Sequence, residues 1–322
     1  MMVVPTVPLQ PARILRLSFA AAVLLVAAWA IVGLAGEHRV GDVLGALAEI
    51  SPSRIGASIV LAFLAYFVLT GYDTLAFRYI GRALPYRWIG PAAFVSYAFG
   101  NNAGNNLIGA TAVRLRLYTL WGLSVGEIAR VAIFCSVGFW FGYLVLSSAV
   151  LLAGYAPTIG PLDKLPRTAH YVVATVLLMI VAGYFVLVLL WRKPIGAFRL
   201  KLMLPTWRLT LAQITVTLTN LTLVTATLYV LLPPHENLRF IAFLGMVVVA
   251  LVTGVASQVP GGLGVFEAVM LGMLVDVLPA DRVLAVLIAF RAILYVLPFL
   301  LAVPLLLVLE RAARTGKPVQ RE

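Results

Sequence analysis

Long apolar runs alternate with short polar segments along nearly the whole chain. A helix that spans a bilayer needs roughly 20 apolar residues. Six unbroken runs approach or exceed this length, at 17–34, 55–77, 128–153, 171–191, 209–232 and 283–309. Two further apolar stretches, 88–120 and 240–278, are interrupted near the middle. The pattern predicts an all-α polytopic membrane protein, with one transmembrane domain over residues 1–322.

Each interrupted stretch is broken by glycine, proline or both. The first break is the tract from Gly100 to Asn106, and the second is the tract from Ser257 to Gly264. Proline lacks a backbone donor and glycine adopts non-helical backbone readily, so both tracts are expected to end a helix. The expected break residues are Gly100 and Gly104 in the first tract, and Pro260, Gly261, Gly262 and Gly264 in the second.

The basic residues indicate the orientation of the chain in the membrane. Arginine and lysine are concentrated at 13–16, 78–87, 192–208 and 311–321, whereas the other loops mix acidic and basic residues. Because cytoplasmic loops are enriched in lysine and arginine, both termini are predicted to be cytoplasmic. Stretch 88–120 then begins and ends inside, and stretch 240–278 begins and ends outside. Each is therefore predicted to be a re-entrant hairpin, and the two hairpins enter from opposite faces.

The two halves of the chain share one pattern at an offset of 156 residues. The offset aligns the breaks and three long runs, and it pairs identical residues such as Leu107 with Leu263 and Phe134 with Phe290. Because each half has three full spans, an odd number, the second copy lies in the membrane with the opposite orientation to the first. We therefore predict an inverted repeat, 1–156 and 157–322, of six full spans plus two hairpins. We read run 17–34 as a retained span rather than a signal peptide, because the second half contains its counterpart.

Inverted repeats with broken helices in matching positions are typical of transporters that bind their substrate near the bilayer midplane. Backbone groups freed by a break cannot face lipid, so both breaks are expected to line an internal cavity.

Composition excludes several classes of function. The chain is 62% hydrophobic and 11% charged, with a mean hydropathy of +1.04, which excludes an ordinary soluble domain. The net charge of +12 follows the loop asymmetry, and no motif points to nucleic acid. The only cysteine, Cys135, excludes a disulfide within one chain, and three separated histidines make a metal site improbable. No catalytic motif is present, and no cofactor is expected.

Charged residues inside apolar runs are the strongest candidates for function, because each is costly to insert. Glu267, on the return leg of the second hairpin, is expected to pair with Arg291 in the last run; the pair is either purely structural or also contacts substrate. Arg114 shares a helix face with Tyr118, and either reaches the headgroup layer or points into the cavity, where its guanidinium suits a phosphate. Asp73 pairs with Arg78 or with a hairpin arginine, or caps the interface.

Amides and hydroxyls form a second group of candidates. The four asparagines of the first break, among them Asn102, Asn105 and Asn106, and Gln258 in the second either satisfy freed backbone groups or bind a headgroup. Run 209–232 carries a threonine-rich face. Hydroxyls that bond to the carbonyl four residues earlier are the first explanation of this face, and a polar cavity wall is the second.

Three motifs carry a resemblance to a known family. They are the tract Tyr97–Tyr118 with its Val-Arg-Leu-Arg-Leu-Tyr ending, Gly122-Leu-Ser-Val-Gly-Glu-Ile128, and Val259-Pro-Gly-Gly-Leu-Gly-Val-Phe-Glu267. On these three motifs the chain resembles the lysylphosphatidylglycerol synthase transmembrane-region family, which includes the flippase portion of the multiple-peptide-resistance proteins. The resemblance implies lipid translocation, and it implies a role in that activity for Asp73, Arg114, Glu267 and Arg291.

Full-length members of that family also carry a cytoplasmic aminoacyl transferase domain, whereas this chain ends at Glu322. We therefore expect no soluble synthase domain and no enzymatic activity. The leading hypothesis is a translocase of an anionic or aminoacylated phospholipid, or a related lipid, in the bacterial inner membrane. The alternatives are a membrane subunit that scaffolds a lipid or cell-envelope enzyme, and a small-solute transporter. Candidate partners are membrane lipids, a second copy of the chain and a lipid-synthesis enzyme.

Overall fold

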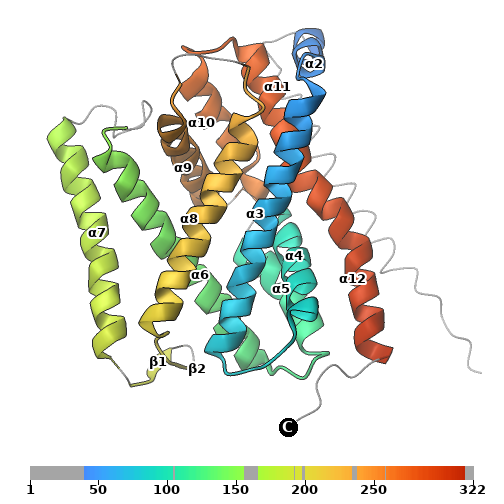
Figure 1. Cartoon of the computed structure of the whole chain (residues 1–322), viewed down its shortest axis with the longest axis vertical. Coiled ribbons are helices and arrows are strands. Elements are labelled where there is room, and N and C mark those ends of the chain that lie inside the picture. The colour runs from blue at the N-terminus through green and yellow to red at the C-terminus, as the bar shows by residue number, and fades with distance from the viewer. Residues whose placement is uncertain are drawn as a thin grey trace, which may run out of the picture.

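The computed structural model describes residues 40–103, 106–155, 166–191, 193–197, 200–233, 238–257 and 259–315. The predicted span 17–34 lies outside these residues. The described residues form a bundle of helices, and most of the loops that connect the helices lie at the two ends of its long axis (Figure 1). A short helix, α2 (Val40–Ala48), lies beside the start of the first long helix.

Among the described residues, five long helices are apolar enough to cross a membrane. They are α3 (Pro52–Tyr79), α6 (Val125–Leu152), α7 (Arg167–Leu190), α8 (Trp207–Tyr229), and the continuous segment formed by α11 (Ala280–Arg291), the π-helical segment η2 (Ala292–Val296) and α12 (Leu297–Thr315). These five helices correspond to five of the six predicted spans. The protein is therefore a helical, multi-pass membrane protein.

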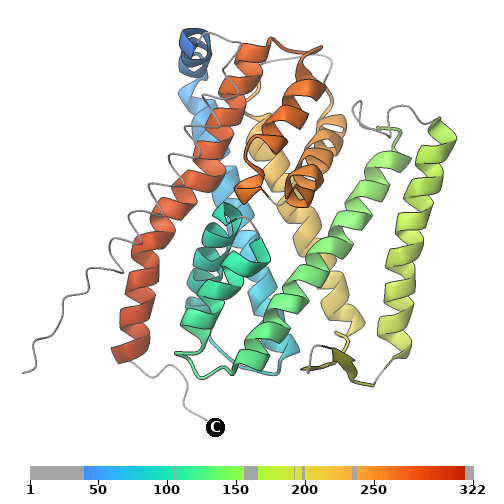
Figure 2. The same cartoon turned by 180° about the vertical axis from the view of Figure 1, so that it is seen from behind.

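Two pairs of shorter helices lie at opposite ends of the bundle. In Figure 1, α4 (Tyr86–Asn102) and α5 (Asn106–Tyr118) occupy the lower half, while α9 (Phe240–Ala256) and α10 (Val265–Leu274) occupy the upper half. Figure 2 shows the same separation from behind. Each pair turns back near the middle of the bundle, so the two hairpins approach it from opposite ends; their entry from opposite membrane faces stays a prediction.

The first break lies inside the predicted tract Gly100–Asn106, between the end of α4 at Asn102 and the start of α5 at Asn106. Helix α4 continues through Gly100 to Asn102, and the backbone becomes extended at Ala103. The expected break at Gly100 is therefore wrong. Gly100 and Gly109 instead let α4 and α5 pack closely: a Cβ added to Gly109 would lie only 3.0 Å from the Cα of Gly100. Gly104 and Asn105 lie outside the described residues.

The second break agrees with the prediction. Helix α9 ends at Ala256, and a single 3-10 turn, η1 (Pro260–Gly262), precedes α10. Gly261, Gly262 and Gly264 have φ angles of 60°, 61° and 80°, a region that side chains other than glycine rarely adopt. These glycines let the chain reverse within a few residues.

A two-stranded antiparallel hairpin was not predicted by the sequence. Strand β1 (Ile195–Ala197) pairs with β2 (Leu200–Leu202) between α7 and α8, with Ile195 opposite Leu202. The description of the chain as all-α is therefore incomplete. Pro194 prevents α7 from continuing, and this end of the bundle does not require a helix as the bilayer core does.

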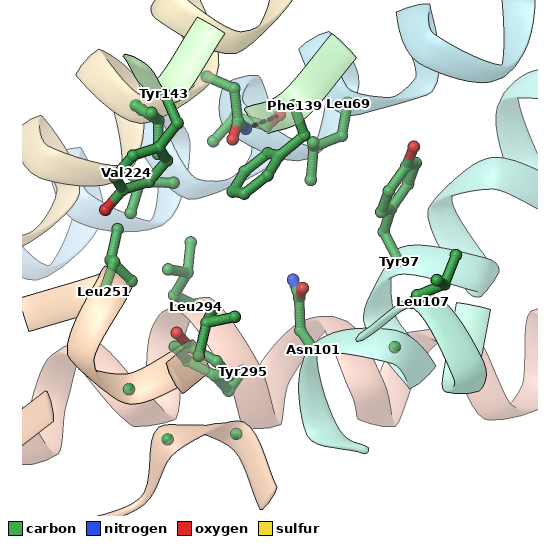
Figure 3. A pocket seen from close by; sticks show the side chains of 18 of the residues that line it. Leu69, Tyr97, Asn101, Leu107, Phe139, Tyr143, Val224, Leu251, Leu294 and Tyr295 are labelled. Atoms are coloured by element: carbon green, nitrogen blue, oxygen red, sulfur yellow. Dashed lines mark hydrogen bonds between the residues drawn. The ribbon is translucent and has the colours of Figure 1, made fainter. Parts of the chain in front are cut away.

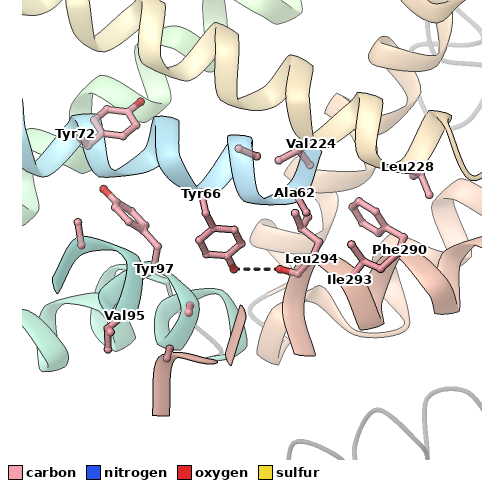
Figure 4. Packing of buried hydrophobic residues seen from close by; sticks show 14 of the residues in the cluster. Ala62, Tyr66, Tyr72, Val95, Tyr97, Val224, Leu228, Phe290, Ile293 and Leu294 are labelled. Atoms are coloured by element: carbon pink, nitrogen blue, oxygen red, sulfur yellow. Dashed lines mark hydrogen bonds between the residues drawn. The ribbon is translucent and has the colours of Figure 1, made fainter. Parts of the chain in front are cut away.

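The π-helical segment η2 lies in the core, where it accepts hydrogen bonds from the first half of the chain. Pro298 has no backbone N–H, so the Leu294 carbonyl four residues earlier lacks its α-helical donor. Two carbonyls of the segment accept the hydrogen bonds from the first half. The Tyr66 hydroxyl of α3 donates to the Leu294 carbonyl at 3.1 Å, and the Asn102 amide of α4 donates to the Tyr295 carbonyl at 3.3 Å. Figure 4 shows Tyr66 reaching Leu294 within the packed interior. These bonds hold α3 and α4 against the last long segment.

Helices α6 and α8 pack closely through two glycines of α6. Gly138 and Gly142 face Gln213 and Thr217 of α8, and a Cβ added to Gly138 would lie 2.7 Å from the Gln213 amide nitrogen. The Thr217 hydroxyl donates to the Gly138 carbonyl at 3.2 Å. Glycines four residues apart are a common way for membrane helices to approach each other.

The threonine-rich face of α8 is explained mainly by local hydrogen bonds. The hydroxyls of Thr215, Thr217, Thr222 and Thr227 each donate to the carbonyl four residues earlier, at 2.8 to 3.0 Å. The first of the two sequence-based explanations is therefore confirmed for these four residues.

Substitution of Gly142 by leucine is expected to destabilise the protein by about 1–3 kcal/mol, because the new side chain overlaps Thr217 and α6 must move away. The measurement is the thermal unfolding midpoint in detergent. The matched control is Gly183→Leu in α7, where an added Cβ has nothing within 4 Å. Equal midpoints for the two variants would contradict close packing of α6 and α8.

Candidate functional site

A buried ion pair joins the return leg of the first hairpin to α3. Arg114 of α5 donates from Nε and Nη2 to the two carboxylate oxygens of Asp73, both at 2.8 Å. Arg114 and Asp73 are 2% and 0% exposed. The Tyr118 hydroxyl, one turn after Arg114, donates to the same carboxylate at 2.7 Å. Of the partners considered for Asp73, the structure selects the hairpin arginine.

A second ion pair closes the turn of the other hairpin. The Nε of Arg291 donates to Glu267, as expected from the sequence. Its terminal nitrogens donate to the Gly261 carbonyl at 2.6 Å and to the Gly262 carbonyl at 3.2 Å. Glu267 also accepts from the Gly264 amide at 2.8 Å. The pair therefore satisfies backbone groups that the break releases, which would otherwise be costly in the bilayer.

Three other ion pairs each keep a well exposed side chain. Arg116 pairs with Glu310 of α12, Arg82 with Glu127, and Arg282 with Glu49. The exposed fractions of the three arginines lie between 45% and 48%. Of the two arginines on α5, Arg116 is thus the one near the surface and Arg114 the one inside.

A cavity of about 390 Å³ lies where the tips of the two hairpins meet. Figure 3 shows side chains from several helices around its open centre, with Asn101 projecting into it from α4 and Phe139 facing it from α6. Both breaks line it, through Ala103 on one side and Gly261 and Gly262 on the other, and Gly100 in the last turn of α4 lies beside Ala103 in the wall. The expectation that both breaks face a cavity is confirmed.

Of the residues that the sequence offered for substrate binding, Arg114 lines this cavity, and so does Asn101, one of the four asparagines of the first break. Asp73, Tyr118, Glu267 and Arg291 lie behind the wall and hold it in place. The Asn102 amide is bound to the Ala98 and Tyr295 carbonyls. Asn106 begins α5, but its side chain is not among the described groups, and Asn105 and Gln258 lie outside the described residues.

Several cavity residues were not singled out from the sequence. They are aromatic: Tyr66, Tyr72, Tyr97, Phe139, Trp140, Tyr143, Phe266 and Tyr295. Tyr97 and Asn101 are one helical turn apart, as are Phe139 and Tyr143. This spacing puts each pair on a single helix face. The spacing was visible in the sequence, but which face is internal was not.

Comparison with known proteins places the chain among membrane proteins. No family model matches it. It is 31% identical over 267 residues to the inner membrane protein YbhN of Escherichia coli, covering 80% of each chain. The chain belongs to the family of YbhN. A second relative, described as uncharacterized protein slr0712 of Synechocystis, is 35% identical over 268 residues, with 81% of each chain covered.

Proposed function

We propose that this member of the YbhN family is a lipid translocase of the bacterial inner membrane, with cytoplasmic termini, that moves a phospholipid between leaflets. The observation that carries the proposal is the cavity between the tips of two hairpins that lie at opposite ends of the bundle, lined by both breaks. A lipid in either leaflet could reach a site in this position by passing the hairpin that lies on its own side of the bundle. The resemblance to the lysylphosphatidylglycerol synthase transmembrane-region family supports the same activity.

The cavity also borders the lateral surface of the bundle. Its wall includes Leu107 of α5, Trp140 of α6 and Val255 of α9, which are 43%, 44% and 47% exposed. These large apolar side chains lie where a bilayer would surround the protein, so the cavity faces lipid between α5, α6 and α9. A volume of about 390 Å³ suits a headgroup. The acyl chains would remain in the bilayer. This lateral position favours a lipid over a small solute.

The proposed inverted repeat supplies the means of alternating access. Adding 156 to the bounds of α3 gives 208–235, which overlaps α8, and the same shift takes α4 to 242–258, over α9. For α5 and α6 it gives 262–274, which covers α10, and 281–308, which falls on α11 to α12. Related elements thus surround the cavity from both ends, an arrangement that suits rocking of one half against the other.

The proposal is tested by reconstituting the protein in liposomes and measuring exchange of tail-labelled phospholipids between leaflets by chemical quenching. Ser136→Trp fills the cavity from α6 and is expected to reduce exchange at least tenfold, because the headgroup loses its space. The matched control, Ala149→Trp, places the same side chain on an exposed position of α6 and should retain exchange.

Both proteins must elute as single species in detergent before they are compared. Exchange no faster than in empty liposomes, for every phospholipid tried, would reject translocation and favour the scaffold hypothesis. Equal exchange by the two tryptophan variants would show that lipid does not pass through this cavity.

A further inference from the structure

The cavity wall has no net charge among the described residues. Arg114 is the only charged side chain that lines it, and both oxygens of the Asp73 carboxylate bind that arginine. The second pair, Glu267 with Arg291, is also balanced and lies behind the wall. An ion that enters such a site leaves water without gaining a counter-charge, at a cost of several kcal/mol. The wall therefore favours a ligand whose own charges sum to zero.

One end of the cavity offers hydrogen-bond donors to a ligand. The Tyr97 hydroxyl is buried, and the one described group that it can bond to is the Cys135 thiol, a weak acceptor. The Arg114 guanidinium lies over the Tyr97 ring, with Cζ 5.0 Å from its centroid. Nε and Nη2 of Arg114 bind Asp73, and no described residue accepts a hydrogen bond from Nη1. A buried hydroxyl that has only a weak acceptor gains from a ligand that offers a stronger one.

Another part of the wall offers aromatic faces. Phe139, Trp140 and Tyr143 of α6 lie against one another, with ring centroids 5.6 to 6.0 Å apart. The Tyr143 hydroxyl is engaged with the Val248 carbonyl, so its ring is held in place. Aromatic faces attract ammonium groups, and the attraction is strongest where water is excluded. Tyr295 is less available for this purpose, because Arg291 already lies 4.4 Å from its centroid.

From these features we infer that the cavity binds the headgroup of a zwitterionic phosphodiester lipid. The phosphate accepts hydrogen bonds from the Tyr97 hydroxyl and from Nη1 of Arg114, and the ammonium lies against Phe139, Trp140 and Tyr143. The ammonium balances the phosphate, so Asp73 can stay bound to Arg114. An anionic phospholipid would leave one negative charge uncompensated. The inference rests on the proposed translocase function and narrows its substrate.

The test uses the reconstituted full chain and three tail-labelled lipids with identical acyl chains: phosphatidylcholine, phosphatidylglycerol and an uncharged glycosyl diacylglycerol. Phosphatidylcholine is expected to exchange at least tenfold faster than either of the others. Equal or faster exchange of phosphatidylglycerol or of the glycolipid would overturn the inference while leaving translocation in place. If none of the three exchanges, the proposed function itself fails.

Two variants test the assigned ends of the headgroup. Tyr97→Phe removes only the hydroxyl and should lower phosphatidylcholine exchange about tenfold, the equivalent of one hydrogen bond to a charged group. Trp140→Leu should lower it roughly threefold to tenfold. Tyr171→Phe and Trp191→Leu are the matched controls, since both residues are exposed and belong to or adjoin α7. Unchanged exchange in both test variants would overturn the assignment.

Discussion

Substitution of Asp73 by asparagine is expected to destabilise the protein by about 3–5 kcal/mol, because Arg114 would remain buried without its counter-charge. The carboxylate of Asp73 accepts three hydrogen bonds, two from Arg114 and one from Tyr118. An amide oxygen can replace only part of this set. The return leg of the first hairpin should therefore separate from α3. The measurement is the thermal unfolding midpoint in detergent, together with the fraction of monodisperse protein.

Two further variants show whether the loss comes from the buried charge. Glu127→Gln removes a carboxylate whose arginine partner, Arg82, is 45% exposed, and should cost no more than about 1 kcal/mol. The double variant Asp73→Asn with Arg114→Gln removes both charges and should recover part of the lost stability. If Asp73→Asn unfolds at the wild-type temperature, the pair is not the buried support described above.

Substitution of Arg291 by glutamine is expected to have an effect of similar size, about 3–5 kcal/mol. This change leaves Glu267 without its cation and leaves the Gly261 and Gly262 carbonyls without their donors. The turn of the second hairpin should open locally before the bundle unfolds. Hydrogen–deuterium exchange measures this directly, since the amides around Gly264 should exchange faster in the variant.

The same helix supplies the matched control for Arg291. Arg282 of α11 is 48% exposed and lies 3.6 Å from Glu49, so Arg282→Gln should change stability by less than about 1 kcal/mol. Arg291→Lys should fall between the two, because lysine keeps the charge but lacks the fork that reaches two carbonyls. Normal protection of the turn in Arg291→Gln would show that this arginine does not hold the break.

Much of the fold could be predicted because the bilayer restricts what the chain can form. Length and hydropathy identify α3, α6, α7, α8 and the last long segment, and glycine with proline marks the second break. The π-helical segment and the β-hairpin were not predicted. The π-helical segment lies inside an apolar run whose Pro298 and Pro304 were not treated as a break, because the apolar pattern continues through both. The β-hairpin lies in a loop.

One of the buried ion pairs could be predicted from the sequence, whereas the aromatic wall of the cavity could not. Glu267 and Arg291 could be paired in advance, because a buried carboxylate needs a cation and few were available. The aromatic wall could not be predicted, because every long helix carries tyrosine, phenylalanine or both, and only packing decides which of these side chains face inwards. Asn101 and Asn102 illustrate the limit: they are adjacent in sequence, yet only Asn101 lines the cavity.

The position of the two buried ion pairs has a consequence for the energy of conformational change. Asp73 with Arg114, and Glu267 with Arg291, each join residues of the same half of the chain, so each hairpin is fastened to a long helix of its own half. The ion pairs that cross between the halves, such as Arg116 with Glu310, keep one partner in reach of water or headgroups. The hydrogen bond from the Tyr66 hydroxyl to the Leu294 carbonyl also connects the two halves, and both of its groups are neutral. Sliding one half against the other therefore exchanges contacts worth about 1 kcal/mol each, and no buried charge has to lose its partner.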